Sequence, residues 1–245
     1  MKIAIYGLGR FGSFWARLLA EHGADVIAYS RHKHDVPEGV RVASEDEVLS
    51  APYIFFCVTI SAFENVLKRV GARISKSSVV MDTCSVKTYP AKWMEEYIAK
   101  DVYKIATHPM FGPDSGANGV EGLPIAMCPI SPIDDRFEVV KDFFLSMGLE
   151  VLQMSPREHD QAAAYSQGVT HFVGRTLDLM NIKPTPIATQ GYRSLMSIVE
   201  QTCNDPIQLF YDLQRYNPYA KEMRLSLQVA LEKVLNRLAE EDDKH

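Results

Sequence analysis

Three glycines near the start of the chain constrain its fold more than any other feature. Residues 2–12 read Lys-Ile-Ala-Ile-Tyr-Gly-Leu-Gly-Arg-Phe-Gly, so that Gly7, Gly9 and Gly12 form a G-x-G-x-x-G pattern directly after a short β-branched run. A helical pattern follows over residues 13–22. In that context the first glycine allows a tight turn, the second lets a pyrophosphate approach the backbone, and the third allows helix and strand to pack closely. The pattern predicts a dinucleotide site at the helix N-terminus, the alternative being a glycine-rich structural turn.

The end of the next expected strand, residues 25–30, indicates which dinucleotide fits. An NAD site usually has an acidic residue there to bind the ribose hydroxyls, whereas this chain has Ser30, Arg31 and His32. Because a guanidinium matches the geometry of phosphate oxygens, we expect NADP rather than NAD; a solvated basic turn is the alternative. The expected cofactor-binding residues are Gly7, Gly9, Arg10, Phe11, Gly12, Ser30, Arg31 and His32.

The first part of the chain alternates apolar runs with helical patterns. Residues 53–58 and 78–82 are continuous apolar runs, which is typical of parallel strands buried on both faces. Further strands are expected at 102–107, 124–128 and 150–153, and helices at 61–74 and 88–100. The sequence therefore predicts an α/β protein with a Rossmann-type doubly wound parallel sheet, residues 1–153 forming the NADP-binding domain.

After residue 153 the apolar spacing becomes helical. Helices are expected at 158–180, 186–203, 206–215 and 220–240, which makes residues 154–245 an all-helical substrate and dimerisation domain. A helical domain of about 90 residues buries little apolar surface by itself. We therefore expect a homodimer through this domain, with an active cleft between the two domains.

Composition narrows the classes of partner. A formal net charge of −5 argues against nonspecific binding of nucleic acid or anionic membranes. No apolar run approaches the roughly 20 residues of a membrane span, so a cytoplasmic location is expected. The four cysteines are scattered, which predicts neither a metal site nor disulfides.

Two stretches of the chain contain candidate catalytic residues. Residues 108–116 read His-Pro-Met-Phe-Gly-Pro-Asp-Ser-Gly, and their prolines and glycines indicate a rigid loop that is neither a helix interior nor a central strand. The loop opens with His108, a side chain suited to moving protons near neutral pH. This stretch and residues 83–87 both begin at the carboxyl ends of expected strands, where α/β sheets bind their ligands.

With these motifs the chain resembles the prephenate and arogenate dehydrogenase family of tyrosine biosynthesis, most closely its plant-type arogenate dehydrogenases. The likeness covers nearly the whole chain and is carried by the following motifs: Gly7-Leu-Gly-Arg-Phe-Gly12, Ser30-Arg31, Ser85-Val86-Lys87, Thr107-His-Pro-Met-Phe-Gly-Pro113, Glu158-His-Asp160, Ser166-Gln167, Thr170-His171, Val173-Gly174-Arg175, Gly191-Tyr192 and Tyr216-Asn217. The family oxidises a cyclohexadienyl ring at the carbon that bears its hydroxyl, and the ring loses CO₂ and becomes aromatic. The resemblance implies that His108 accepts the hydroxyl proton and that Ser85 hydrogen-bonds both hydroxyl and imidazole.

The resemblance also implies a set of substrate-binding residues: Ser85, His108, Ser115, Gln167, His171, Arg193 and Asp205. Many bacterial members bind the side-chain carboxylate with an arginine where this chain has Ser197, so that Arg193 or Arg175 is expected to substitute. Asp205 either binds the ammonium group of arogenate or caps a helix that starts near Pro206.

Some interpretations stay open. Lys87 is either a partner for a substrate carboxylate or a surface lysine. Two other functions compete with the family's: another NADP-dependent oxidoreductase of similar two-domain build, and an NADP(H)-sensing protein without catalysis. The favoured reaction is oxidation of arogenate rather than of prephenate.

Overall fold

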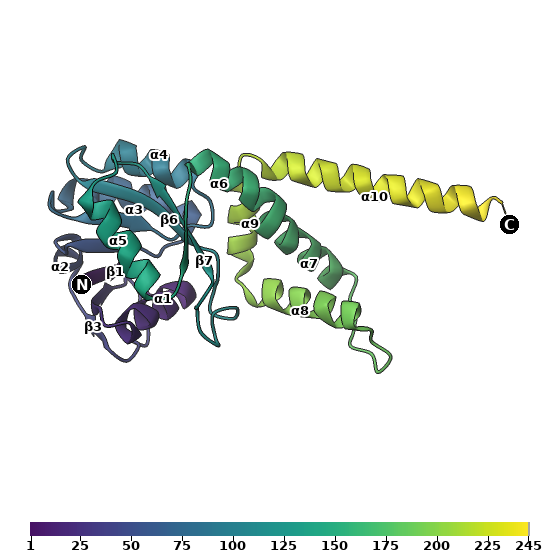
Figure 1. The fold of residues 1–245 in the computed structure, drawn as a ribbon, viewed down its shortest axis with the longest axis horizontal. Helices are drawn as coiled ribbons and strands as arrows, with labels where there is room; N and C mark the ends of the chain where they lie inside the picture. Colours follow the sequence, from purple (N-terminus) through teal and green to yellow (C-terminus); the bar gives the residue numbers. More distant parts are fainter. Residues whose placement is uncertain (245) are drawn as a thin grey trace. The chain divides into compact units, whose positions relative to one another are not determined.

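The computed structural model describes residues 1–244 and divides the chain into two compact units, Met1–His159 and Asp160–His245 (Figure 1). The first unit is an α/β unit and the second is helical. The assignment of the first part to cofactor binding and of the second to substrate binding stays a prediction.

One eight-stranded sheet forms the centre of the first unit. Its strand order is β3-β2-β1-β4-β5-β6-β7-β8. The strands are β1 (Lys2–Tyr6), β2 (Asp25–Tyr29), β3 (Val40–Val42), β4 (Tyr53–Phe56), β5 (Val79–Asp82), β6 (Tyr103–Pro109), β7 (Pro124–Pro129) and β8 (Glu150–Gln153). The order reverses between β1 and β4, as in doubly wound sheets.

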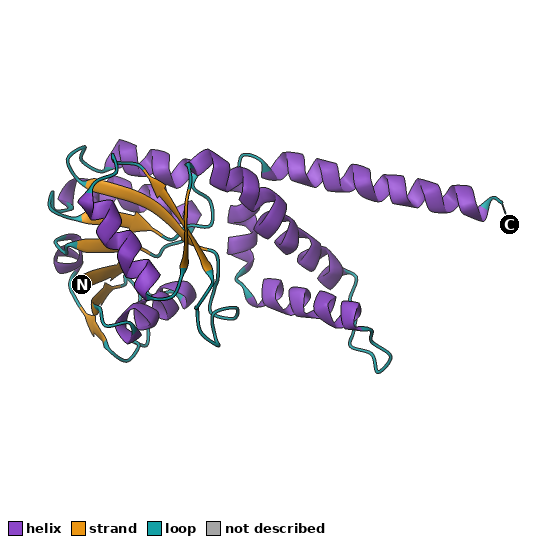
Figure 2. Cartoon of the chain, viewed as in Figure 1, coloured by secondary structure: helices purple, strands orange, loops and turns teal. Residues whose placement is uncertain are grey.

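Helices cover both faces of this sheet (Figure 2). They are α1 (Arg10–Glu21), α2 (Glu45–Leu49), α3 (Ile60–Val70), the short η1 (Gly71–Arg73), α4 (Thr88–Tyr97) and α5 (Asp135–Ser146). On one face Trp15 of α1 and Phe144 of α5 contact Phe55 of β4; on the other, Phe63 of α3 contacts the next residue, Phe56. Adjacent strand residues thus enter opposite cores, which explains the uninterrupted apolar run in β4.

The prediction of a wholly parallel sheet is wrong in one place. β7 runs antiparallel to β6, with His108 opposite Ala126, and β8 is parallel to β7. A parallel return requires a crossover, usually a helix, but the connection over residues 110–123 contains none. The other adjacent pairs are parallel, so the Rossmann-type class is confirmed.

The second unit consists of helices. Its elements are the end of α6 (Pro156–Ala163), the π-helical turn η2 (Ala164–Gly168), α7 (Val169–Leu179), α8 (Gln190–Asn204), α9 (Ile207–Tyr216) and α10 (Ala220–Asp242). α7 and α8 approach closely, because a Cβ added at Gly174 would lie 2.2 Å from Thr202 Oγ1. The later part of α10 extends beyond the other helices of this unit (Figure 1). No helix in the described residues is long and apolar enough for a membrane span.

Candidate active site

The glycine loop between β1 and α1 has the geometry of a phosphate-binding turn. Gly7 has φ of +112°, and a Cβ added there would lie 2.5 Å from Cys57 O. A Cβ added at Gly12 would lie 2.0 Å from Gly7 O, whereas one added at Gly9 would meet no described atom within 4 Å. The fold itself therefore requires two of the glycines, and the third leaves open space beside the start of α1.

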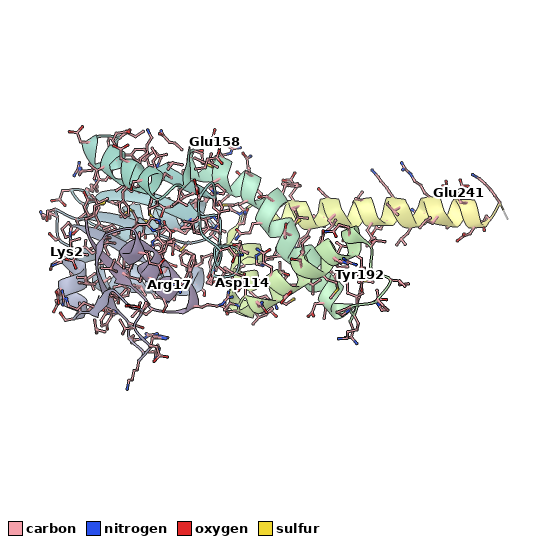
Figure 3. The ribbon with its side chains drawn as sticks, turned by 60° about the horizontal axis from the view of Figure 1, so that its bottom comes forward. Lys2, Arg17, Asp114, Glu158, Tyr192 and Glu241 are labelled. Carbon is pink, nitrogen blue, oxygen red and sulfur yellow. The ribbon has the colours of Figure 1, made fainter. Side chains whose placement is uncertain are left out.

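The start of α1 fits an anion. Gly9 is its N-cap residue, and no side chain caps the helix there, so backbone N–H groups are left to bind a phosphate. Arg10 pairs with Asp114 at 2.6 Å, and Asp114 lies at the surface of the loop that follows β6 (Figure 3). Phe11 stacks on Trp15. The loop thus suits a dinucleotide, with Arg10 beside it and Phe11 partly in the core.

The end of β2 holds the residues expected to select NADP. Ser30 is half-buried, while Arg31 and His32 are exposed immediately after the strand. In residues 1–244 Arg31 pairs with no carboxylate. Asp25 lies at the opposite end of β2. The basic tip is therefore open to a ligand.

His108 is the most enclosed of the candidate catalytic groups. It is the penultimate residue of β6 and only 3% exposed. Its Nδ1 lies 2.9 Å from Nε2 of His159, which is 2% exposed. Burial, followed by the charges of His159 and Lys87, lowers the pKa of His108 well below the ordinary 6.5. The imidazole is therefore neutral at physiological pH, as a proton acceptor must be.

The expectation that residues 108–116 avoid a central strand is wrong for the first two. His108 and Pro109 end β6, which lies between β5 and β7. Pairing with β5 stops at Ala106, so that Pro109 lies opposite a neighbour only on the β7 side. A proline that lacks a donor is tolerated there. Farther on, Ser115 Oγ accepts a hydrogen bond from Gly112 N at 2.9 Å, which closes a turn.

Ser85 lies in the loop after β5, the strand adjacent to β6. Its Oγ is buried and has no hydrogen-bond partner among the described residues. Ser85 thus lies just after the carboxyl end of β5, and His108 lies at the carboxyl end of the neighbouring strand β6. The structure contains no hydrogen bond between these two side chains. A buried hydroxyl without a partner is costly unless a ligand satisfies it.

The interpretation of Lys87 as a surface lysine is wrong, while its role as a partner for a substrate carboxylate stays a prediction. The side chain is fully buried, and its Nζ donates to Asp82 Oδ2 at 2.5 Å and to Thr107 O at 2.6 Å. Asp82 also accepts from Cys84 N at 3.0 Å and Thr107 N at 3.1 Å. This network joins the Ser85 loop to the strand that carries His108. A sequence pattern does not separate a buried, paired lysine from an exposed one.

In the helical unit, three predicted or suggested residues share one helix face. Gln167, His171 and Arg175 follow at four-residue spacing, beginning in the π-helical turn, a feature frequent at functional sites. Buried atoms without a hydrogen-bond partner among the described residues are Gln167 Oε1, His171 Nδ1 and Arg175 Nε. Burial and then the charge of Arg175 lower the pKa of His171 to about 4.

Asp205 lies beside this face. His171 Nε2 is 4.0 Å from Asp205 Oδ2, and Arg175 Nη2 donates to Asp205 O at 2.7 Å and to Thr202 O at 2.9 Å. Asp205 ends α8, whereas the N-cap of α9 is Pro206 with no side-chain cap. Asp205 thus lies one residue before the N-cap of α9, and its interpretation as a helix cap stays a prediction.

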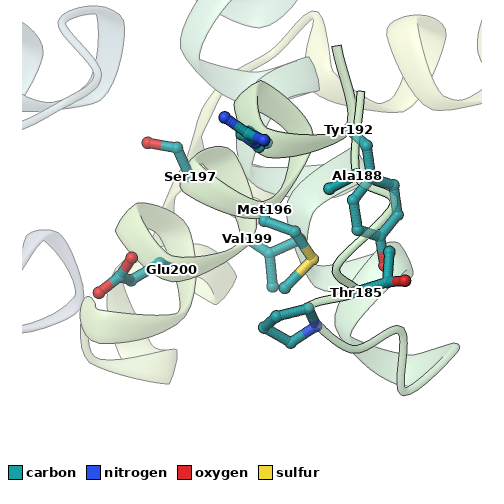
Figure 4. Close-up of a pocket in the computed structure, with 9 residues that line it drawn as sticks. Thr185, Ala188, Tyr192, Met196, Ser197, Val199 and Glu200 are labelled. Carbon is teal, nitrogen blue, oxygen red and sulfur yellow. The ribbon is translucent and has the colours of Figure 1, made fainter. Parts of the chain in front are cut away.

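Arg193 is not part of this cluster. It is exposed near the start of α8, about 16 Å along the helix axis from its end by the rise of 1.5 Å per residue. There it lines a pocket of about 570 Å³ with Tyr192, Ser197 and Glu200. Figure 4 shows Tyr192 on one side of the pocket and Ser197 and Glu200 on the other. Arg175, the other suggested carboxylate partner, is bound by backbone carbonyls.

Comparisons with known proteins agree with the resemblance seen in the sequence. Residues 15–153 match the nucleotide-binding domain of prephenate dehydrogenase, and residues 176–245 match a TYRAAT1-like C-terminal domain. The chain belongs to the prephenate dehydrogenase family. It is an oxidoreductase of the arogenate and prephenate dehydrogenase class, acting by oxidative decarboxylation of a small-molecule substrate in tyrosine biosynthesis with a dinucleotide of the NAD(P) type.

Two relatives from Arabidopsis thaliana are named arogenate dehydrogenase 2, chloroplastic, and arogenate dehydrogenase 1, chloroplastic. Both are 35% identical over 97% of this chain, which spans 70% of the first relative and 39% of the second. This match disfavours both alternative functions, namely another NADP-dependent oxidoreductase and a non-catalytic sensor.

Solved structures share the fold. Prephenate dehydrogenase from A. aeolicus, in complex with hydroxyphenyl propionate and NAD+, has a TM-score of 0.72 at 22% identity, covering 98% of this chain and 90% of that one. Synechocystis arogenate dehydrogenase has a TM-score of 0.71 at 20% identity, with coverages of 99% and 93%. Within the described residues no group of side chains could hold a metal ion.

Sequence reasoning missed two contributors to the site. His159 was noted within a motif but given no role, and Asp82 was read only as the end of a strand. Two sequence signals could have identified them. His159 lies just inside a helix whose start carries a capping pattern, and Asp82 is an acidic residue in an otherwise apolar, buried run.

Proposed function

We propose that the protein is an NADP-dependent arogenate dehydrogenase, which converts arogenate to tyrosine and CO₂. The observation that carries the proposal is the state of His108. It is buried at the carboxyl end of β6, and burial lowers its pKa well below 6.5. It lies in the same unit as the open space beside Gly9. A neutral acceptor and an uncapped helix start are the two parts that such an oxidation needs from this unit.

His108 acts as the base for the ring hydroxyl. A bound dinucleotide would supply the acceptor for the hydride that leaves the carbon bearing this hydroxyl. His108 takes the hydroxyl proton as the C–O bond becomes a carbonyl, and the ring carboxylate then leaves as CO₂. Its bonding electrons enter the ring, which becomes a phenol after the former carbonyl oxygen is protonated. Ser85 Oγ, buried without a partner, donates to that oxygen and fixes its position.

Asp205 provides the preference for arogenate. The substrate carries an ammonium group where prephenate carries a ketone, and a carboxylate forms a charge-assisted hydrogen bond only with the former. Gln167 and His171 supply further polar atoms without partners on the adjoining helix face. The names of the two plant relatives support the same preference.

Ser30, Arg31 and His32 select NADP. The exposed guanidinium has no ion pair within residues 1–244, and a 2′-phosphate would supply one in a bidentate geometry. Arg10 and Phe11 border the pyrophosphate site. Ser115 contributes to substrate binding from the loop after β6. Arg193 lies too far along α8 from Asp205 for both to bind one substrate side chain, so it is left out of the proposed site.

The protein acts as a homodimer in the cytoplasm. An apolar stripe of Leu227, Leu231, Val234 and Leu238 on α10 supports self-association, because its last three members are each more than half exposed. The names of the plant relatives specify chloroplasts, so the location of this chain is tested separately, by imaging a tagged copy.

Initial rates with purified protein test the reaction. Arogenate and prephenate are offered separately, each with NADP and with NAD, and reduced cofactor is followed by absorbance. Turnover of arogenate with NADP, at a kcat/KM at least tenfold above the other three combinations, is the expected result. Turnover of prephenate alone would refute the substrate assignment, and absence of turnover with all four would refute the function.

Two variants test the roles proposed for Asp205 and His108. Asp205→Asn is expected to lower kcat/KM for arogenate by about 10- to 100-fold, since one charge-assisted hydrogen bond contributes roughly 1.5–3 kcal/mol. It should leave cofactor affinity unchanged. His108→Asn is expected to lose turnover and retain NADP binding, measured by titration calorimetry. An Asp205→Asn enzyme with unchanged kcat/KM would remove Asp205 from the site.

A further inference from the structure

The start of α6 holds His159 in a fixed position. Ser155 Oγ accepts from Glu158 N at 3.2 Å, and Glu158 Oε2 accepts from Ser155 N at 2.8 Å. This reciprocal pair is a capping box, and Pro156 occupies the first helical position, where proline is favoured. The backbone N–H of His159 then donates to Ser155 O at 3.0 Å. The helix start therefore sets where the His159 ring lies.

The contact between His159 and His108 has two possible proton arrangements. Nδ1 of His108 and Nε2 of His159 lie 2.9 Å apart, with both side chains buried. If His159 donates, the hydrogen of neutral His108 sits on Nε2, and no lone pair remains for a substrate hydroxyl. If His108 donates from Nδ1, its Nε2 keeps a lone pair and can accept a proton.

The charged groups near His108 do not determine which of the two histidines donates the hydrogen. Lys87 is the nearby cation, and its charge is paired with Asp82 at 2.5 Å. Burial is the largest cause of the lowered pKa of His108, and the charged groups that contribute within residues 1–244 are His159 and Lys87, neither of them a carboxylate. In hydrolase triads a carboxylate orients the histidine base. Here a second imidazole, that of His159, occupies the corresponding position.

We propose that His159 is a positioning residue, which accepts the Nδ1 hydrogen of His108 and so keeps the Nε2 lone pair of His108 available to the substrate. The inference rests on the proposed role of His108 as base. When Nε2 takes the hydroxyl proton, His108 becomes a cation that carries hydrogens on both nitrogens. Its bond to His159 Nε2 is then charge-assisted and stronger, so His159 stabilises the state that develops during the reaction.

Two substitutions separate this role from space filling. In His159→Gln the amide oxygen lies the same number of bonds from Cβ as Nε2 and still accepts a hydrogen bond. His159→Met has comparable bulk and no comparable acceptor. We expect His159→Met to lower kcat by about 10- to 100-fold, with KM for NADP unchanged. This is at or below the lower end of the roughly 10²–10⁴-fold that general-base catalysis contributes, because the variant disturbs the base and does not remove it. His159→Gln should stay within about threefold of the wild type, as should the exposed-site control His34→Met.

Nuclear magnetic resonance of the full chain, labelled with ¹⁵N histidine, reads the tautomer without any turnover. His108→Asn identifies the His108 signals. The expected spectrum has His108 protonated at Nδ1 in the wild type and in His159→Gln, and a mixture of tautomers in His159→Met. A wild-type His108 protonated at Nε2, or equal kcat values for the Met and Gln variants, would overturn the proposal. If no cyclohexadienyl substrate is turned over, the proposed function fails, while the spectrum still decides the inference about the tautomer.

Discussion

Two histidines in this chain are kept neutral by burial, and that has a measurable consequence for stability. The pKa of His171 falls to about 4 and that of His108 lies well below 6.5. In the unfolded chain both groups take up protons near pH 6.5, whereas in the folded chain they do so only at lower pH. The unfolded state therefore binds more protons between about pH 6.5 and 4, so stability is lost as pH falls through this window.

The expected loss from His171 alone is about 3 kcal/mol between pH 7 and pH 4, from 1.36 kcal/mol per pKa unit. Urea unfolding at a series of pH values measures it. His171→Gln should flatten the dependence by this amount, while the exposed His34→Gln should leave the slope unaltered. A His171→Gln protein with the full wild-type dependence would show that this ring takes up its proton at the same pH in the folded and the unfolded chain.

The buried pair of Lys87 and Asp82 makes a second prediction at the residue scale. Removing one partner leaves an uncompensated buried charge, which typically costs 3–5 kcal/mol. Lys87→Met should therefore lower the free energy of unfolding by roughly that amount and also reduce kcat, since the pair joins the Ser85 loop to the strand of His108. Lys100→Met, at an exposed position, is the control.

In a double-mutant cycle, Asp82→Leu with Lys87→Met should be less destabilised than the sum of the two single variants, because neither charge is then stranded. Additive effects in chemical denaturation would mean that the two side chains are not coupled. Equal stability of Lys87→Met and the wild type would contradict the buried ion pair itself.

At the scale of elements, two glycines of the turn between β1 and α1 have different roles: Gly12 contributes to stability and Gly9 to cofactor binding. A Cβ at Gly12 would meet Gly7 O at 2.0 Å, so Gly12→Ala must displace backbone. A Cβ at Gly9 would meet no described atom within 4 Å, but it would occupy the space that a pyrophosphate needs. We expect Gly12→Ala to lower Tm by several degrees, through a loss of about 1–3 kcal/mol typical of overpacking.

Gly9→Ala should keep the wild-type Tm and weaken NADP binding by about tenfold or more, consistent with roughly 1.4 kcal/mol per tenfold change. Differential scanning fluorimetry and calorimetric titration give the two readings. Gly9→Ala with normal affinity would place the pyrophosphate elsewhere.

Long, strongly patterned elements were predictable from the sequence. The apolar runs at β4 and β5 and the glycine pattern indicated the sheet and its first turn, because such runs reflect burial on both faces. β3 and α2 were missed, since three and five residues are too short for a periodic signal. α5 was also missed, although Asp134 caps it and Phe137, Val140 and Phe144 lie on one face.

The site was less predictable than the fold. Local sequence indicated His108 and Ser85, but the 2.9 Å contact to His159 joins residues 51 positions apart, and the reversed direction of β7 depends on a connection without a helix. Neither follows from periodicity. The burial of Lys87 likewise depends on Asp82 and Thr107 of other strands.

At the scale of the whole molecule, each unit carries groups that the other lacks. The first has the glycine loop, His108 and Ser85; the second has the polar face of Gln167 and His171 beside Asp205. The second also carries α10, a helix of 23 residues and about 34 Å at 1.5 Å per residue. Only Ala220 and Met223 at its start are buried. A long helix with so little burial is rarely stable alone, because helices gain most of their stability from packing.

The stripe of Leu227, Leu231, Val234 and Leu238 has the four-three-four spacing of a helix-pairing seam. Two carboxylates in the seam, Val234→Glu with Leu238→Glu, should convert the expected dimer to a monomer, because charges cannot be buried there without partners. Ser226→Glu with Asn236→Glu adds the same charge to α10 outside the seam and should leave the dimer intact. Sedimentation velocity at micromolar concentration measures the mass of each form. A monomeric wild type would refute the homodimer, and a dimeric seam variant would place its interface on another surface of the chain.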